Sequence, residues 1–262
     1  MSLPELHLVT AGEGAPVLLV HGSAADHTTW SIQLKSMAAH ARLITWDRRG
    51  ADTSPLPPEV SFFTVEQHAD DAARLIEREV GGPVVTCGSS FGGVVVLDLA
   101  RRRPDLVHGA VLLEPPLHPD DLERGIPESF LAEYDRLERE HDGPTAAEFF
   151  LRHVLGDEAF ERMPRRFQER SKSMWRQIRQ DTAALGEYRV RYRALREVTT
   201  PFLLLGGERS APFFRPTLEA LHASLGNAQL ETLTGAGHMM HAEVFRRFNE
   251  RLLSFMAELG HS

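Results

Sequence analysis

Ser90 lies in Gly88-Ser89-Ser90-Phe91-Gly92, a Gly-x-Ser-x-Gly pattern between two apolar runs. The run 84–87 predicts a buried strand and the run 94–97 predicts a helix, so the serine stands on the turn between them. The flanking glycines suit a turn too sharp for side chains at those positions. A hydroxyl held beside the amides of a helix N-terminus favours attack on a carbonyl, with the oxyanion held by N–H groups. A glycine-rich turn without chemistry is the alternative.

A serine nucleophile needs a base, and His238 is the candidate. It stands in Gly235-Ala236-Gly237-His238, directly after the last predicted strand (229–233). Glycines on that side let a short loop place an imidazole over the carboxyl ends of parallel strands, where such sheets keep their sites. His241 is the rival, but it is expected to begin the final helix.

Two carboxylates are candidates for the group that orients the histidine. Glu114 ends the predicted strand 109–113, and two prolines follow it. Glu208 ends the next predicted strand, 201–205, in Gly206-Gly207-Glu208. From position alone, either carboxylate can reach the imidazole.

Backbone amides are the expected oxyanion donors. One is the amide of Phe91, the residue that begins the helix after Ser90. The second donor is expected in His21-Gly22-Ser23, which follows the buried strand 16–20, with the amide of Ser23 as the donor. An ordinary turn at the end of that strand is the alternative.

The elements that must position these groups alternate between strands and helices. This rhythm predicts an α/β fold with a mostly parallel sheet and helices on both faces. Residues 117–196 break it, with no convincing strand and amphipathic stretches at 129–140, 145–155 and 158–185. We therefore predict a core of residues 1–116 and 197–262, with residues 117–196 inserted as a helical cap.

Four residues are candidates for lining a substrate pocket near Ser90: His21, Trp30, Trp175 and Met239. For Trp175 in the predicted cap, a place in the helical core is the alternative. The oppositely charged halves of the cap predict solvated faces packed on each other. An arginine such as Arg176 or Arg179 meeting an anionic group is the alternative.

Composition restricts the classes of partner. The chain has 262 residues and a formal net charge of −8, which argues against general nucleic-acid binding and against anionic membranes. No apolar run reaches membrane-spanning length, and no basic and apolar leader opens the sequence, so we expect a cytoplasmic protein acting on a small molecule. We expect neither a metal nor another cofactor in the reaction, because the sequence holds no HExxH and no Cys/His cluster. The oligomeric state is left open.

These motifs, in this order, resemble those of the α/β-hydrolase superfamily. His21-Gly22-Ser23 resembles its oxyanion turn, Gly88–Gly92 its nucleophile elbow and Gly237-His238 its terminal histidine loop. Asp47-Arg48-Arg49-Gly50, with Asp52 and Ser54 behind it, is similar to its Asp-x-Arg-Gly-x-Gly-x-Ser loop, although Ala51 and Thr53 depart from it. The resemblance implies an eight-stranded sheet, a Ser-acid-His triad and a helical cap after the sixth strand.

One departure from the family pattern concerns the acid. The usual Asp after the seventh strand is replaced here by Arg209. Some haloalkane dehalogenases and the zearalenone-lactonase type carry a Glu after the sixth strand instead, and Glu114 occupies that place. The resemblance thus favours Glu114 over Glu208. Ser90 stands where dehalogenases and epoxide hydrolases of the superfamily have an Asp.

The sequence therefore predicts a serine hydrolase that cleaves a small ester, lactone or thioester through an acyl-enzyme intermediate. A cofactor-free haloperoxidase-like perhydrolase and a carbon–carbon bond hydrolase are alternatives with the same triad. A ligand receptor that keeps the fold without turnover is an alternative of another class.

Overall fold

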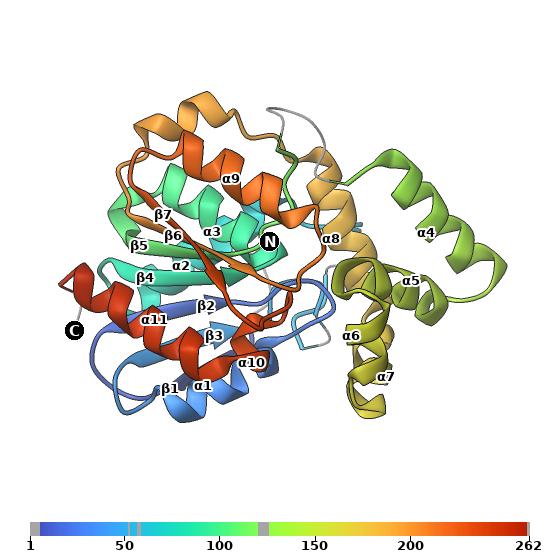
Figure 1. The fold of residues 1–262 in the computed structure, drawn as a ribbon, viewed down its shortest axis with the longest axis horizontal. Helices are drawn as coiled ribbons and strands as arrows, with labels where there is room; N and C mark the ends of the chain where they lie inside the picture. The colour runs from blue at the N-terminus through green and yellow to red at the C-terminus, as the bar shows by residue number, and fades with distance from the viewer. Residues whose placement is uncertain (1–5, 52, 57–58, 120–125, 261–262) are drawn as a thin grey trace.

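The predicted strands form one sheet in a computed structural model that describes residues 6–51, 53–56, 59–119 and 126–260 (Figure 1). Asp52, in the loop of residues 47–54 that carries Arg48 and Arg49 (the arginine loop), lies outside the described residues. The strand order is β1-β3-β2-β4-β5-β6-β7, and every pairing is parallel except that of β1 with β3. The strands are β1 (Leu8–Ala11), β2 (Pro16–Val20), β3 (Arg42–Trp46), β4 (Val84–Ser89), β5 (Val107–Leu113), β6 (Phe202–Gly207) and β7 (Ala228–Leu233).

The mostly parallel sheet confirms the predicted fold class, but the number of strands differs. The described residues form seven strands, one fewer than the resemblance implies. The sheet's first edge is the short strand β1, which runs antiparallel to β3. The chain turns from β1 into β2 within residues 12–15, where Gly12 and Gly14 have φ of 82° and 99°.

Helices cover both faces of the sheet (Figure 1). Each face has its own apolar cluster, because buried strands present alternate side chains to opposite sides. The helices on one face are α2 (Val65–Glu79), α3 (Phe91–Arg102) and α9 (Phe214–Ser224). Those on the other are α1 (Ser31–Ser36) and α11 (Phe245–Glu258).

The start of α2 shows how locally the sequence sets these elements. A capping box begins this helix: the amide of Gln67 donates to Thr64 Oγ1 at 3.3 Å, and Gln67 Oε1 accepts from the amide of Thr64 at 2.9 Å. The short elements that complete the chain are 3₁₀ helices η1 (His27–Trp30), η2 (Pro104–Leu106) and η3 (Tyr192–Glu197), and helix α10 (Met240–Glu243).

The described residues between β5 and β6 form five α-helices at one side of the sheet (Figure 1). They are α4 (Glu128–Glu140), α5 (Gly143–Leu155), α6 (Asp157–Arg162), α7 (Arg165–Ser173) and α8 (Trp175–Glu187). The predicted stretch 158–185 is broken into three helices. Pro164 separates α6 from α7, since proline has no N–H and disfavours helical backbone before it. α4, α5, α6 and α8 share an apolar cluster that includes Tyr134, Phe150 and Ile178.

None of the helices in the described parts of the chain combines the length and the apolar character needed to cross a membrane.

Candidate active site

Ser90 sits at the turn between β4 and α3 in a strained backbone conformation. Its φ is 52° and its ψ −121°, a positive φ that non-glycine residues seldom adopt. Its amide donates to the carbonyl of Leu113 in β5 at 2.8 Å, which fixes the turn to the neighbouring strand. A Cβ on Gly88 would lie 2.2 Å from the carbonyl oxygen of Gly92, and one on Gly92 would lie 2.3 Å from that of Val20. Neither contact is possible, so both glycines are required by space.

His238 and Glu114 form a buried pair beside this turn. Nδ1 of His238 lies 2.6 Å from Oε2 of Glu114, and the two residues are 5% and 1% exposed. The other carboxylate oxygen accepts the amide of Gly207 at 2.7 Å. The ring of Phe214 stacks on the imidazole at 4.4 Å between centroids, with 9° between planes. With Nδ1 held by the carboxylate, Nε2 is the nitrogen left for a substrate or a nucleophile.

The two rivals of this pair have other partners. Glu208 is exposed, and its Oε2 accepts the amide of Gly235 at 2.7 Å, so it closes the loop before His238. His241 is buried, with Nε2 3.1 Å from Thr29 Oγ1 and its ring 4.6 Å from that of Trp30. Burial, with a smaller contribution from His238, lowers the pKa of His241 to about 3, so its imidazole is neutral near pH 7.

Ser90 and His238 line the same small cavity, of about 60 Å³. No hydrogen bond joins these two described side chains; catalytic hydrogen bonds often tighten only when substrate binds. The wall opposite them is mostly apolar and comes from the inserted helices. From that side come Phe150, Leu151, Val154, Leu155, Met163 and Ser171, and from the sheet side Gly22, Ser23, Ala24, Ala25, Thr29, Ser89, Ser90, His238, Met239 and His241.

Of the predicted pocket residues, Met239 lines this cavity and three others do not. His21 is fully buried: its Nε2 accepts the amide of Arg48 at 3.0 Å, and burial, with the nearby positive charge of Arg48, lowers its pKa to about 3. Trp30 lies behind His241, packed on Phe248.

Trp175 is the third correction. It packs on the backbone of Gly143 at the start of α5, where a Cβ would lie 2.2 Å from the indole. Trp175 therefore packs within the inserted helices, which agrees with the alternative interpretation of this residue as part of the helical core. Arg179 pairs with Asp135 at 2.6 Å, and the guanidinium of Arg176 lies over the Trp175 ring, so both arginines contact other inserted residues.

The loop 21–25 brings Ser23 to the cavity, and it is called the oxyanion loop below because the sequence predicts an oxyanion donor there. Phe91 is the first residue of α3. An amide at that helical position has no acceptor within its own helix. Both residues that carry the predicted donors thus lie near Ser90: Ser23 lines the same cavity, and Phe91 follows Ser90 in the sequence.

Arg48 holds the oxyanion loop by hydrogen bonds to its backbone, a role that the sequence analysis missed. Its guanidinium donates to the carbonyls of His21 and Gly22, each at 3.0 Å. It also donates to Asp181 in α8 through two nitrogens, at 3.0 and 2.7 Å. Asp181 in turn accepts the hydroxyl of Ser23 at 2.8 Å. The arginine loop signalled Arg48, but nothing in the sequence distinguished Asp181 among the many acids of the insertion.

A second residue of α8 holds the same loop. The side-chain amide of Gln177 accepts the N–H of Ala25 at 3.2 Å and donates to its carbonyl at 2.9 Å. The inserted helix α8 therefore contacts the oxyanion loop at both Ser23 and Ala25.

Known proteins resemble this chain in both sequence and fold. The chain is 36% identical over 110 residues to an uncharacterized hydrolase, YraK, of Bacillus subtilis, covering 42% of this chain and 41% of YraK. It is 31% identical over 137 residues to the lipase LipV of Mycobacterium tuberculosis, covering 51% of each. The matched part thus spans about two fifths to one half of these relatives.

A thermophilic esterase from Thermogutta terrifontis, in a malate-bound structure, superposes with a TM-score of 0.80 at 25% identity, over 98% of this chain and 94% of the esterase. Est816, described as an N-acyl homoserine lactone degrading enzyme, shares the fold with a TM-score of 0.79 at 20% identity, over 95% of this chain and 96% of Est816. A model of the alpha/beta hydrolase family matches residues 17–251. The chain belongs to the alpha/beta hydrolase family.

Proposed function

We propose that this protein is a serine hydrolase that cleaves a small ester, lactone or thioester through an acyl-enzyme intermediate. The observation that carries the proposal is the His238–Glu114 pair at 2.6 Å, which shares a cavity with a serine held at a φ of 52°. Relatives described as a lipase and an esterase support the same class of reaction. We also propose residues 1–116 and 197–262 as the catalytic core, residues 117–196 as its cap, and a cytoplasmic location.

In the first step His238 Nε2 takes the hydroxyl proton of Ser90 while Oγ forms a bond to the substrate carbonyl carbon. The carbonyl electron pair moves to oxygen, where the amides of Ser23 and Phe91 stabilise the negative charge. Glu114 holds Nδ1 and stabilises the imidazolium. The tetrahedral intermediate then breaks its bond to the alcohol oxygen or thiol sulfur, which takes the proton from His238. In a lactone that alcohol stays attached to the acyl group.

Deacylation repeats these steps with water. His238 removes a proton from water, the hydroxide oxygen bonds to the acyl carbon, and the Ser90 oxygen leaves with the proton. This step releases the acid product and regenerates the free serine, with no redox change.

The cavity indicates which substrates fit. At about 60 Å³ with a largely apolar wall from α5, it accepts a short acyl group without moving the insertion. We expect p-nitrophenyl acetate and butyrate to be turned over faster than the decanoate.

The experiment combines labelling with a matched pair of acid variants. A fluorophosphonate should form one adduct, on Ser90. Glu114→Gln should lower kcat for p-nitrophenyl acetate about 10³- to 10⁴-fold, because an amide holds the wrong tautomer of the histidine. Glu208→Gln, at an exposed loop position, should stay within a few-fold of the parent.

The opposite pattern of the two variants would contradict the role of Glu114, and absence of an adduct on Ser90 in folded protein would contradict the nucleophile. Peracid formation from acetate and hydrogen peroxide, or cleavage of a vinylogous diketone faster than any ester, would favour the perhydrolase or the carbon–carbon hydrolase. Ligand-dependent stabilisation with no turnover would favour a receptor.

A further inference from the structure

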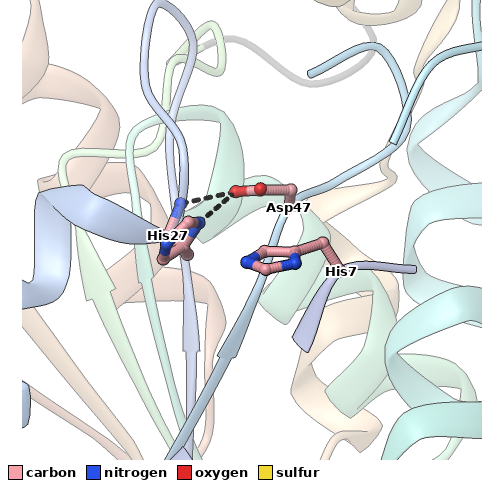
Figure 2. A group of neighbouring side chains, drawn as sticks. All are labelled: His7, His27 and Asp47. Carbon is pink, nitrogen blue, oxygen red and sulfur yellow. Dashed lines mark hydrogen bonds and ion pairs between the residues drawn. The ribbon is translucent and has the colours of Figure 1, made fainter. Parts of the chain in front are cut away.

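Two imidazoles and a carboxylate converge at the sheet edge, in a group separate from the cavity of Ser90. His7 directly precedes β1, His27 opens η1 and Asp47 directly follows β3. Each can offer one ligand atom, and these atoms all lie within 4.8 Å of one another. Figure 2 shows the His7 ring and the His27 ring next to the Asp47 carboxylate. The proposed hydrolysis uses none of them.

The backbone fixes the positions of these residues. β1 and β3 pair antiparallel with Leu8 opposite Trp46, which places His7 opposite Asp47. The amide of Asp47 donates to the carbonyl of His7 at 2.9 Å, and the amide of His7 donates to Ser54 Oγ at 3.2 Å. Directly opposed residues of an antiparallel pair present their side chains on one face.

His27 is anchored to the same carboxylate from the other side. Its amide and its Nδ1 lie 2.7 and 2.8 Å from Asp47 Oδ1. Its ring lies 4.8 Å from that of His7, between centroids, with 55° between planes. The other carboxylate oxygen of Asp47 accepts the hydroxyl of Thr53. Three chain segments far apart in sequence thus present their side chains to one point.

The donor set suits a transition metal ion. Two imidazoles and one carboxylate are ligands that Zn²⁺ accepts, whereas Mg²⁺ and Ca²⁺ prefer oxygen alone. The Thr53 hydroxyl orients the carboxylate, as outer hydrogen-bond partners do in metal sites.

We propose that His7, His27 and Asp47 bind one divalent transition metal ion of the zinc type, with water as the fourth ligand. Zinc bonds of about 2.1 Å in a tetrahedron place ligand atoms about 3.4 Å apart. The longer separations, at most 4.8 Å, must therefore close by no more than about 1.4 Å, and the 2.8 Å between His27 Nδ1 and Asp47 Oδ1 must open by about 0.6 Å. His7 is exposed and can supply that movement by rotating its side chain. In the bound state the metal takes the place of the proton between His27 Nδ1 and Asp47 Oδ1.

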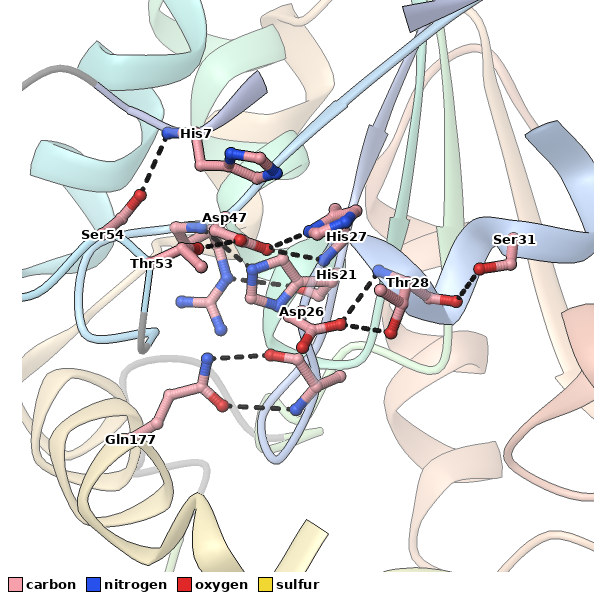
Figure 3. A network of polar contacts seen from close by, with 12 residues as sticks. His7, His21, Asp26, His27, Thr28, Ser31, Asp47, Thr53, Ser54 and Gln177 are labelled. Atoms are coloured by element: carbon pink, nitrogen blue, oxygen red, sulfur yellow. Dashed lines mark hydrogen bonds and ion pairs between the residues drawn. The ribbon is translucent and has the colours of Figure 1, made fainter. Parts of the chain in front are cut away.

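The surroundings allow a hydrated ion to enter. An open hollow of about 580 Å³ is lined by His7 and Thr53, together with Leu6, Leu8, Arg78 and Glu79. The bound ion joins the edge strand β1 to β3 and to the segment that follows the oxyanion loop. Figure 3 shows that segment, with His27 and Asp26 at one end and Gln177 contacting the loop from α8.

The test uses the full chain without an affinity tag, freed of metal by a chelator and desalted. Zinc chloride is titrated against a chromogenic chelator, and one equivalent of tight binding is expected. His7→Ala should weaken it at least about tenfold, the scale on which even outer partners of a metal act. This variant leaves both backbone hydrogen bonds of residue 7 in place. His40→Ala is the matched control and should bind as the parent does, because His40 is exposed and precedes β3, whereas Asp47 follows that strand.

A second variant and a second metal test independently whether residue 7 is a metal ligand. His7→Cys restores a zinc ligand and should bind again, and Co²⁺ should give a tetrahedral visible spectrum that His7→Ala abolishes. Magnesium at the same concentration should not compete. Zinc binding unchanged in His7→Ala, as expected for an ion held by His238 and His241, would overturn the proposal, and so would a parent protein that binds no zinc. Because binding is the readout, either result is independent of whether Ser90 hydrolyses esters.

Discussion

The ion pair between Arg48 and Asp181 couples the inserted helices to the proposed oxyanion hole, and Asp181→Asn tests that coupling. The two side chains are 0% and 2% exposed. The carboxylate accepts three hydrogen bonds, two from Arg48 and one from Ser23. Removing its charge leaves the guanidinium buried without a counter-ion.

Breaking such a buried pair costs about 3–5 kcal/mol of unfolding free energy. Arg48 keeps two carbonyl acceptors, His21 and Gly22, so we expect the lower end, about 3 kcal/mol. At about 2–4 °C per kcal/mol for a chain of this size, Tm should fall by about 6–12 °C. Displacement of the Ser23 amide should also lower kcat, by up to about 10²-fold, the lower end of the cost of losing one oxyanion donor.

Thermal unfolding and p-nitrophenyl acetate hydrolysis measure the two effects. The control is Asp135→Asn, which breaks a pair with Arg179 in the same insertion whose side chains are 32% and 36% exposed, and it should cost less than about 1 kcal/mol. In the double variant Arg48→Met, Asp181→Leu, stability should return while kcat stays low, because apolar residues replace the charges but not the clamp on the loop. If Asp181→Asn matches the parent in both Tm and kcat, the reasoning is wrong.

Two further predictions concern the turn and the buried histidines. Gly92→Ala should lower the free energy of unfolding by at least about 4 kcal/mol or prevent folding, because its Cβ meets the Val20 carbonyl oxygen at 2.3 Å. In Gly82→Ala the new Cβ meets nothing within 4 Å, so urea unfolding should be nearly unchanged. His21 and His241 have a pKa of about 3 in the folded protein and about 6.5 unfolded. Between pH 6.5 and 3 only the unfolded chain takes up these protons. The contribution of the two histidines to the free energy of unfolding is therefore fully present above pH 6.5 and decreases as the pH falls below it. At pH 5 the loss is about 2 kcal/mol per histidine, and equal urea midpoints at pH 7.5 and 5 would refute this.

Strand ends could be located from the sequence because their signal is local. Apolar runs with turn residues behind them placed Ser90, Glu114 and His238 after strands β4, β5 and β7. A parallel sheet brings such ends to one edge, so their proximity follows from the fold class. The choice between Glu114 and Glu208 did not follow from position alone. It depends on which way each side chain turns at its strand end, and the positive φ of Glu114, 45°, has no sequence pattern.

The pocket could not be predicted in the same way. Trp30 and Trp175 are large and apolar, but large aromatics belong more often to cores than to cavities, and both are packed against other residues here. The actual apolar wall comes from α5. Its residues resemble any amphipathic helix, and only the packing of the insertion on the sheet decides which of its faces meets Ser90.

The position of α8 gives the insertion a role beyond covering the cavity. α5 supplies the wall of the cavity proposed to hold the acyl group, whereas α8 contacts the oxyanion loop through Asp181 and Gln177. Substitutions on the two helices should therefore separate: those on α5 change which ester is accepted, and those on α8 change the rate for every ester. The physical reason is that the oxyanion donors act on the carbonyl common to all substrates, while the wall contacts only the part that varies.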